Sequence, residues 1–341
     1  MTHATQRPLV SVVTPSYNQA AFLENTIRSV LGQDYPAVEY LIVDGASQDG
    51  SQSILQKYSR QLAWWVSEPD SGQAVAINKG LRRARGEILA WLNSDDLYLP
   101  GAISAAVRVL QSNPAPGMVF GDALTIDASG RPLNQLRFGN WGLDELMGFR
   151  IICQPAVFMR RSTLEAAGLL DPSYHFMLDH HLWLRMARLA PVQHVPELWA
   201  AARYHLDAKN VAQASGFGKE TMRILAWMET QPDLAARLAA GRKRILSGAH
   251  RLNARYLLDG DQPGPALQEY GRALLANPRF ALAHWHRMLF AVFSLLGFKN
   301  LAGLYYRLQE KRRPALGNLP ELQNWPGLSI ETNAPKNQAA A

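Results

Sequence analysis

The chain has 341 residues, of which 48% are hydrophobic and 18% are charged, and its formal net charge is +7 at pH 7. This composition excludes a disordered chain, and the length allows either two domains or one large domain with an appendage. The single cysteine, Cys153, excludes an intrachain disulfide and a cysteine-based zinc cluster, and it favours a reducing compartment. The positive charge fits an anionic membrane, nucleic acid or an anionic substrate, without choosing among them.

The two ends of the chain are expected to carry little structure. Residues 1–7 are polar and have no apolar segment, so we expect a flexible N-terminus and no signal peptide. Residues 331–341 are expected to form a disordered tail. The longest apolar run, 288–298, is shorter than the ~20 residues that a membrane-spanning helix needs. These features predict a cytoplasmic protein.

Strands and helices are expected to alternate over the first 120 residues. Four apolar, partly β-branched runs predict buried strands at 9–14, 38–43, 62–67 and 88–92. Helical spacing of apolar residues follows each run, at 22–31, 51–58, 74–85 and 102–111. Four such alternations predict an α/β fold with a doubly wound, mostly parallel sheet flanked by helices.

Two adjacent carboxylates, Asp95 and Asp96, end the fourth apolar run. Both would be costly to remove from water without a positive partner, which a divalent cation carrying phosphates would supply. The alternative is that one of them only caps the helix that starts near Pro100. Polar clusters follow the other strands too, and the carboxyl ends of parallel strands meet along one edge, where ligands bind. Capping alone explains this recurrence poorly.

Two common nucleotide-binding motifs are absent from the sequence. No Gly-x-Gly-x-x-Gly follows the first strand, and no Gly-x-x-x-x-Gly-Lys-Ser/Thr occurs. A typical dinucleotide-binding fold and a P-loop NTPase are therefore unsupported.

The second half of the chain predicts a different organisation. A hairpin is expected at 124–138, a strand at 154–159 and further strands between 192 and 204. From about residue 213 the pattern becomes helical, and 254–278 resembles one tetratricopeptide-type hairpin. A single unit is too few for a stable array, so an ordinary α-helical appendage is the alternative.

Five segments, taken together, resemble the family 2 glycosyltransferases with the GT-A fold. They are Ser-Val-Val-Thr-Pro-Ser-Tyr-Asn at 11–18, Val-Asp-Gly-Ala-Ser-Gln-Asp-Gly-Ser at 43–51, the segment 72–86, Asn-Ser-Asp-Asp at 93–96, and Leu-Asp-His-His-Leu-Trp-Leu-Arg at 178–185. The resemblance implies a glycosyltransferase domain over 8–212, followed by a helical region over 213–330.

The resemblance also implies roles for the polar residues that follow the strands. Tyr17, with Pro15 and Ser16, and Asp44 would hold the nucleobase and ribose of a nucleotide diphosphate sugar. Tyr17 offers a flat ring for stacking, and Asp44 accepts hydrogen bonds. In the aspartate motif, Asp95 would meet the ribose.

The second aspartate of the motif, Asp96, would bind Mg²⁺ or Mn²⁺, with His205 as a second candidate ligand. Such a cation would bridge the diphosphate oxygens and stabilise the leaving group. Basic groups that would meet the diphosphate are Arg203, His205 and Lys209; the alternative is that they are solvated surface residues. Residues that would hold the donor sugar or order a loop are Asp70, Gln73 and Asn78.

By the same resemblance, the reaction inverts the anomeric centre and Asp179 is the base that deprotonates the acceptor. The alternative is that Asp179 caps a helix over 182–190. The family usually has an acid before this aspartate and often another two residues after it, where this chain has Leu178 and His181. A charged His180 or His181 would lower the pKa of Asp179 and weaken it as a base.

The implied function is metal-dependent transfer of a sugar from a UDP-, GDP- or dTDP-linked donor to a glycan or lipid-linked acceptor, in cell-surface or lipid-linked polysaccharide biosynthesis. No nucleic-acid partner is expected. The apolar run 288–298 and nearby basic residues predict peripheral contact with the inner face of the cell membrane, or else the buried face of the appendage.

Two rival functions stay open from the sequence. A nucleotidyltransferase that forms a nucleotide sugar would begin with a Gly-rich, basic phosphate loop, which 15–19 lacks. A non-catalytic, sugar-nucleotide-binding scaffold would not need Asp96 and Asp179.

Overall fold

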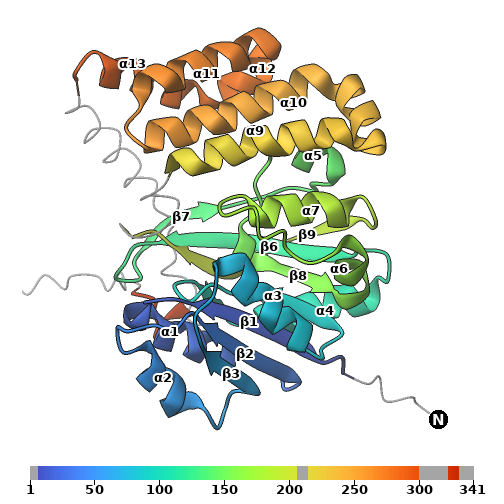
Figure 1. Cartoon of the computed structure of the whole chain (residues 1–341), viewed down its shortest axis with the longest axis vertical. Helices are drawn as coiled ribbons and strands as arrows, with labels where there is room; N and C mark the ends of the chain where they lie inside the picture. Colours follow the sequence, from blue (N-terminus) through green and yellow to red (C-terminus); the bar gives the residue numbers. More distant parts are fainter. Residues whose placement is uncertain (1–6, 206–213, 299–321, 330–341) are drawn as a thin grey trace, which may run out of the picture.

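The computed structural model describes residues 7–205, 214–298 and 322–329 (Figure 1). Its first third follows the predicted alternation. Four strands pair in parallel in the order β3-β2-β1-β4: β1 (Val10–Ser16), β2 (Val38–Asp44), β3 (Trp64–Ser67) and β4 (Ile88–Trp91). The intervening helices are α1 (Ala20–Leu31), α2 (Ser51–Tyr58), α3 (Gln73–Arg83) and α4 (Ala102–Ser112).

The second part of the sheet is mixed, which corrects the expectation of a mostly parallel sheet. Its strands are β5 (Leu97–Tyr98), β6 (Met118–Ile126), β7 (Pro132–Leu136), β8 (Val157–Arg160) and β9 (Val192–Arg203). The order continues β4-β8-β6-β9-β5, with β7 paired to β6. Here only β6 and β9 run parallel, because β7 returns by the predicted hairpin and β8 enters in the opposite direction.

Short helices and a 3₁₀ turn connect β7 to β8 and β8 to β9. They are α5 (Leu143–Met147), the 3₁₀ turn η1 (Gln154–Ala156), α6 (Arg161–Ala167) and α7 (Leu178–Ala187). Figure 1 shows α5 and α7 between the sheet and the helical region.

The helical region forms a layer stacked on α5 and α7 (Figure 1). Its helices are α9 (Ala214–Thr230), α10 (Pro232–Asp259), α11 (Pro263–Ala276), α12 (Pro278–Ala281), the 3₁₀ turn η2 (Leu282–His284) and α13 (Trp285–Leu295). One hydrophobic cluster joins Trp91 and Trp183 of the lower layer to Ile224, Leu252 and Tyr256 of the helices. The predicted boundary near 212 is therefore not a break in packing. Among the described residues, no helix is both long and apolar enough to cross a membrane.

Residues 322–329, which the sequence assigned to the helical region, lie instead against the sheet. Leu322 is buried among side chains of β5, β6 and β9. The indole of Trp325 donates a hydrogen bond of 2.7 Å to the Tyr98 carbonyl, and Ser329 N donates one of 2.9 Å to the Gly130 carbonyl. This segment, called the C-terminal strap below, thus packs behind the turn that carries the two aspartates.

The parallel register brings the predicted polar clusters to one edge. Ser16, Asp44 and Ser67 are register partners across the ends of β1, β2 and β3. Val13 of β1 pairs with Trp91 at the end of β4, so the Asp95–Asp96 turn follows at the same edge. The candidate site is built at this edge.

Candidate functional site

Asp44 is fully buried and shapes the turn after β2. Its carboxylate accepts hydrogen bonds from the Ser47 backbone N–H (2.9 Å), the Ser47 hydroxyl (2.6 Å) and the Ser67 hydroxyl (2.6 Å). Three donors offset the cost of burying its charge. The structure thus gives Asp44 a positioning role at the predicted nucleotide end of the site.

Tyr17, Gly45 and Asp70 come together from the ends of three strands. Tyr17 is 65% exposed, and a Cβ at position 45 would lie 3.1 Å from its ring and 3.0 Å from Asp70 Oδ2. Gly45 N also donates a hydrogen bond to the carbonyl of buried Ser16 (2.8 Å), which follows buried Pro15. Glycine at 45 therefore leaves room between an exposed aromatic face and a carboxylate.

Asp95 and Asp96 lie in the tight turn between β4 and β5. Neither caps α4, because that helix begins after Gly101, which has a positive φ of 75° and no side-chain cap bond. Asp96 is 6% exposed, and its Oδ1 accepts a hydrogen bond of 2.9 Å from the Arg203 backbone N–H. Burial, together with the charge of Asp95, raises the pKa of Asp96 well above its usual range.

Arg203 lies at the end of β9 and is buried. The sequence predicted that it would contact a diphosphate, but its side chain is not available for that contact. Its guanidinium donates to the backbone carbonyls of Asp95 (2.9 Å), Asp127 (3.0 Å), Ala128 (3.0 Å) and Gly327 (3.5 Å). Arg203 instead joins the aspartate turn to the β6–β7 turn and the C-terminal strap. A sequence pattern could not separate this from a surface arginine.

His205 lies beside the aspartate pair. Its Nε2 is 3.1 Å from Asp95 Oδ2, and its ring lies 4.8 Å from the ring of Phe22 on α1. Phe22 also lies 4.9 Å below the Arg203 guanidinium. His205 is thus held next to Asp95, one residue from the proposed metal ligand. Lys209 lies outside the described residues.

Gln73 and Asp96 are linked through Asn93. Gln73 Nε2 donates to Asn93 Oδ1 (2.8 Å), and Asn93 Nδ2 donates to Asp96 Oδ2 and to Gln154 Oε1, each at 3.2 Å. Gln154 in turn donates to the Trp91 carbonyl (2.8 Å). The sequence interpretation assigned no role to Asn93 or Gln154. The sequence predicted only that Gln154 begins a strand, whereas it lies in η1 and the strand begins at Val157.

Asn78 lies away from this edge. It is buried on α3, where its amide donates to the Leu170 carbonyl (2.8 Å) and accepts from the Leu170 N–H (3.0 Å). Of the two roles left open by the sequence, these contacts and the burial of the side chain support loop ordering.

Asp179 lies in the first turn of α7 and is not its N-cap, which is Met177. Its Oδ1 accepts a hydrogen bond of 2.7 Å from the His180 N–H. Burial raises the pKa of Asp179 to about 6; the Glu220 carboxylate adds to this shift, and the His180 hydrogen bond opposes it. Such a pKa suits a group that takes a proton near neutral pH.

Both histidines that follow Asp179 are neutral, which removes the concern raised by the sequence. Burial lowers the pKa of His180 to about 4 and that of His181 to about 3. His180 stacks on Phe149, and its Nε2 lies 3.0 Å from the Leu146 carbonyl. His181 stacks on Tyr174 at 4.3 Å, and neither of its ring nitrogens has a hydrogen-bond partner among the described residues. Neither ring carries a charge that would weaken Asp179 as a base.

Asp96 and Asp179 share a neighbour, the Cys153 thiol. The half-buried Cys153 thiol lies close enough to both for their charges to raise its pKa, in addition to the larger effect of desolvation. Asp96 comes from the turn between β4 and β5, and Asp179 comes from the first turn of α7.

The residues at the edge fit a divalent cation held partly by its substrate. Among the described residues, no three His, Cys, Asp or Glu side chains cluster as a complete metal site. Mg²⁺ is typically bound by one or two carboxylates together with substrate phosphates. A buried Asp96 with a raised pKa, next to Asp95 and His205, is a donor set of this kind.

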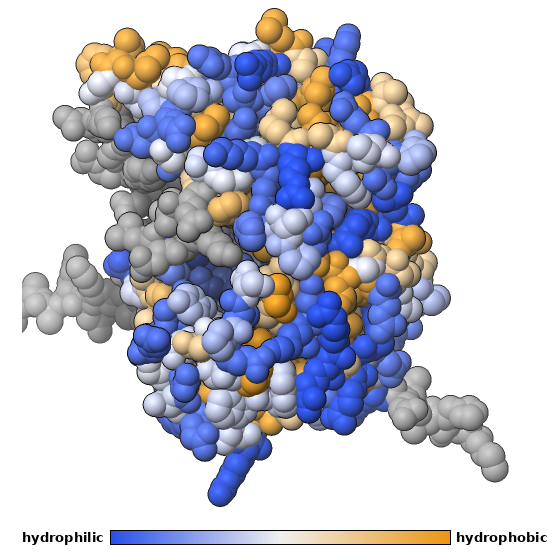
Figure 2. All heavy atoms as spheres, in the orientation of Figure 1, coloured by the Kyte–Doolittle hydropathy of each residue, from blue (hydrophilic) through white to orange (hydrophobic). Residues whose placement is uncertain are grey.

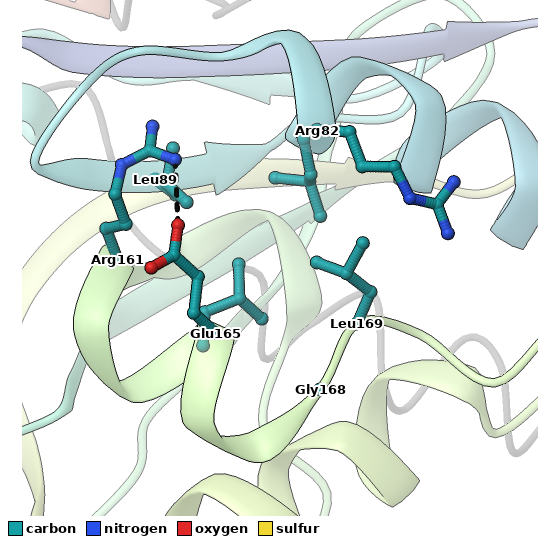
Figure 3. A pocket seen from close by; sticks show the side chains of 8 residues that line it. Arg82, Leu89, Arg161, Glu165, Gly168 and Leu169 are labelled. Atoms are coloured by element: carbon teal, nitrogen blue, oxygen red, sulfur yellow. Dashed lines mark hydrogen bonds and ion pairs between the residues drawn. The ribbon is translucent and has the colours of Figure 1, made fainter.

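A separate cavity of about 310 Å³ lies between α3, β4 and α6 (Figure 3). Arg82, Leu89 and Leu169 line it, and the Arg161–Glu165 ion pair (3.2 Å) lies at its side. None of its lining residues belongs to the predicted site.

Comparisons with known proteins show the family of the chain. The family model for glycosyl transferase family 2 matches residues 11–158. The putative teichuronic acid biosynthesis glycosyltransferase TuaG of Bacillus subtilis (strain 168) is 48% identical over 188 residues, which cover 53% of this chain and 73% of the relative.

Two solved structures share the fold. Mannosyltransferase PcManGT from Pyrobaculum calidifontis, in complex with GDP-Man and Mn²⁺, is 22% identical with a TM-score of 0.56, covering 87% of this chain and 88% of that chain. S. aureus TarS 1-349, in complex with UDP-GlcNAc, is 16% identical with a TM-score of 0.53, covering 89% of this chain and 90% of that chain.

The fold is that of the GT-A glycosyltransferases, with a C-terminal helical region, as the sequence predicted. The chain belongs to glycosyl transferase family 2 and is a glycosyltransferase.

We predict that His181→Phe raises the free energy of unfolding. At pH 7 it removes two buried, unpartnered nitrogens, which cost about 1–3 kcal/mol. The folded pKa of about 3 lies below the unfolded value of about 6.5, so the unfolded state gains the proton as pH falls. The wild type therefore loses a further ~2 kcal/mol between pH 7 and pH 5 that the variant keeps.

Urea unfolding at both pH values measures this difference. His180→Phe is the matched control, since it loses the contact with the Leu146 carbonyl and should bring no gain at pH 7. A His181→Phe advantage that does not widen at pH 5 would contradict the neutral state of His181.

Proposed function

We propose that this chain transfers a sugar from a nucleotide diphosphate sugar to an acceptor hydroxyl, with inversion of the anomeric centre. The proposal is carried by buried Asp96, which lies in one turn with Asp95, and by Asp179 at the start of α7, in a chain of glycosyl transferase family 2. One carboxylate suits a cation on the donor diphosphate, and the other has a pKa matched to deprotonating an acceptor. Direct displacement with one base gives inversion.

Each end of the donor has a candidate partner. Tyr17 offers an exposed ring on which a nucleobase can stack, and Asp70 and Asp95 offer carboxylate oxygens to base and ribose. Asp96, with His205 as second ligand, would hold Mg²⁺ or Mn²⁺, which supplies Lewis-acid stabilisation of the departing diphosphate. The Gln73–Asn93 pair fixes the orientation of Asp96. Lys209 is proposed as a further diphosphate contact.

Asp179 takes the proton of the acceptor hydroxyl as that oxygen attacks the anomeric carbon. It acts in the ionised form because its pKa of about 6 lies below neutral pH. The neutral His180 and His181 add no charge beside it. The hydrogen bond from the His180 N–H fixes the direction of one carboxylate oxygen.

The acceptor is proposed to be a glycan or lipid-linked intermediate of polysaccharide biosynthesis, in the cytoplasm. The likeness to TuaG, a putative teichuronic acid biosynthesis enzyme, supports this choice. The donor nucleotide is proposed to be UDP, GDP or dTDP, since PcManGT was solved with GDP-Man and TarS with UDP-GlcNAc.

Binding of one donor should be metal-dependent. In a thermal-shift panel of UDP-, GDP- and dTDP-linked sugars, with and without Mn²⁺, one donor is expected to stabilise the protein only when the metal is present. Saturation at about 100 times Kd corresponds to roughly 2.7 kcal/mol. Asp96→Asn should abolish the metal-dependent part, whereas Asp34→Asn, on an exposed loop, should not. No shift with any donor would contradict the proposal.

Activity should depend on ionised Asp179. The rate of transfer is expected to fall about tenfold per pH unit below pH 6, because protonated Asp179 cannot accept a proton. Asp179→Asn should lower kcat by roughly 10²–10⁴-fold and leave donor binding intact. Near-normal turnover of this variant, or an acid limb that survives in it, would show that another group is the base.

The helical region is proposed to contact an anionic membrane surface through α13. Its exposed apolar side chains recur at helical spacing, at Trp285, Leu289, Val292 and Leu296. Figure 2 shows apolar residues gathered at the end of the molecule where α13 lies. Together with the net charge of +7, this favours an interfacial helix.

Co-sedimentation with phosphatidylglycerol vesicles tests this surface. The wild type should bind, more weakly at high salt, and the double variant Leu289→Ser, Leu296→Ser should lose most of the binding. Leu189→Ser removes an equally exposed leucine at the end of α7 and serves as control. Equal binding by both variants would exclude α13 as the contact.

A further inference from the structure

The start of α7 lacks a capping side chain of its own. The first N–H groups of a helix have no partner within the helix and need one elsewhere. The N-cap, Met177, makes no side-chain cap bond. This point of the chain lies two residues before Asp179, so whatever holds it also sets where the Asp179 carboxylate lies.

The helical region instead holds the three N–H groups that lead into α7, the last of which belongs to its N-cap. The carboxylate of Glu220, on α9, accepts hydrogen bonds from the backbone N–H groups of His175 (2.7 Å), Phe176 (2.9 Å) and Met177 (2.7 Å). Glu220 is only 8% exposed. Three charge-assisted bonds offset the cost of burying this carboxylate and fix three successive peptide groups.

Glu220 lies at the centre of one face of α9, and this face contacts the segment 173–177. One turn before it, Phe217 packs its ring 5.1 Å from the Phe176 ring. One turn after it, Arg223 donates hydrogen bonds to the Ser173 carbonyl (2.8 Å) and hydroxyl (2.6 Å). The spacing of these three residues places them on one side of the helix.

Glycine at 216 completes this contact. A Cβ at that position would overlap the Phe176 ring, so α9 approaches the segment more closely than any other residue there would allow. The contact therefore fixes the segment through packing, hydrogen bonds and close approach at once.

We propose that Glu220 is a positioning residue for Asp179, through which the helical region becomes part of the catalytic apparatus. The proposal rests on the function proposed above, in which Asp179 is the base. By holding the N–H groups of 175–177, Glu220 fixes the start of α7 and hence the direction of the Asp179 carboxylate. A misplacement of about 1 Å at a reacting group can cost ~10²-fold in rate.

Glu220 also contributes charge to the surroundings of Asp179. The other groups that face Asp179 are the Cys153 thiol and, on α10, the Tyr256 hydroxyl with Arg255 beside it. Glu220 is the carboxylate that raises the pKa of Asp179, after the larger effect of burial. Loss of its charge should therefore lower the pKa of the base.

The test compares Glu220→Gln, Glu220→Asp and Glu229→Gln in the full chain. Glu229 lies on the same helix, is half-exposed and pairs loosely with Arg242 at 3.7 Å, so its amide variant is the matched control. Turnover is read as release of nucleoside diphosphate from the donor found in the panel, with water as acceptor. Backbone hydrogen exchange of 175–177 gives a readout that needs no activity.

Glu220→Gln turns an NH₂ group toward at least one backbone N–H. It should speed exchange of the 175–177 amides, lower kcat by about 10- to 100-fold, leave the donor KM unchanged and move the acid limb to lower pH. Glu220→Asp keeps the charge but is one methylene shorter, so it should lower kcat without moving the limb. Glu229→Gln should match the wild type.

The outcomes separate this proposal from the proposed function. Wild-type exchange at 175–177 in Glu220→Gln, or a kcat equal to that of Glu229→Gln, overturns the positioning role. If kcat falls only in proportion to the folded fraction and the acid limb stays in place, Glu220 is merely structural and the proposal fails. Should Glu220→Gln not fold, Glu220→Asp with the exchange readout decides. An active Asp179→Asn instead refutes the assignment of the base, whatever Glu220 does.

Discussion

The turn that carries Asp95 and Asp96 depends on one buried guanidinium. Arg203 donates to four backbone carbonyls, from the aspartate turn, the β6–β7 turn and the C-terminal strap, and its own N–H reaches Asp96. A buried cation needs such complete pairing, because an unpaired charge in the interior is very costly. By bonding these carbonyls, the guanidinium holds together three segments that are far apart in the sequence. The same cation lies beside two carboxylates that would otherwise repel each other.

Because Arg203 is used in this way, the site edge has little free positive charge of its own among the described residues. His205 lies on Asp95, and Arg203 is turned toward carbonyls. Under the function proposed here, a divalent cation that arrives with the donor would meet much of the charge of its diphosphate. The raised pKa of buried Asp96 has a related cause, because the positive charge near it does not offset its burial and the charge of Asp95.

Much of this arrangement could be predicted from the sequence, because local pattern and one topological rule suffice for it. Apolar runs that end in polar clusters predicted β1 to β4. Because the carboxyl ends of parallel strands meet at one edge of a sheet, the same pattern predicted that Tyr17, Asp70 and the aspartate pair lie at that edge. Contacts between distant segments could not be predicted in this way. Arg203 resembled a surface arginine, and Glu220 carried no motif, because their partners are backbone groups that have no sequence signature.

The C-terminal strap changes what the helical region is. The chain leaves the sheet after β9, builds the helical layer, and comes back to the sheet at 322–329, where Gly327 meets Arg203. The helical layer is therefore an insertion whose two ends both contact the sheet, and not a C-terminal appendage attached at one end. A loop fixed at both ends gives up freedom that a tail would keep. A swing of the helices away from the sheet would strain both of these contacts at the turn of the aspartates, and it would also pull Glu220 of α9 away from the start of α7.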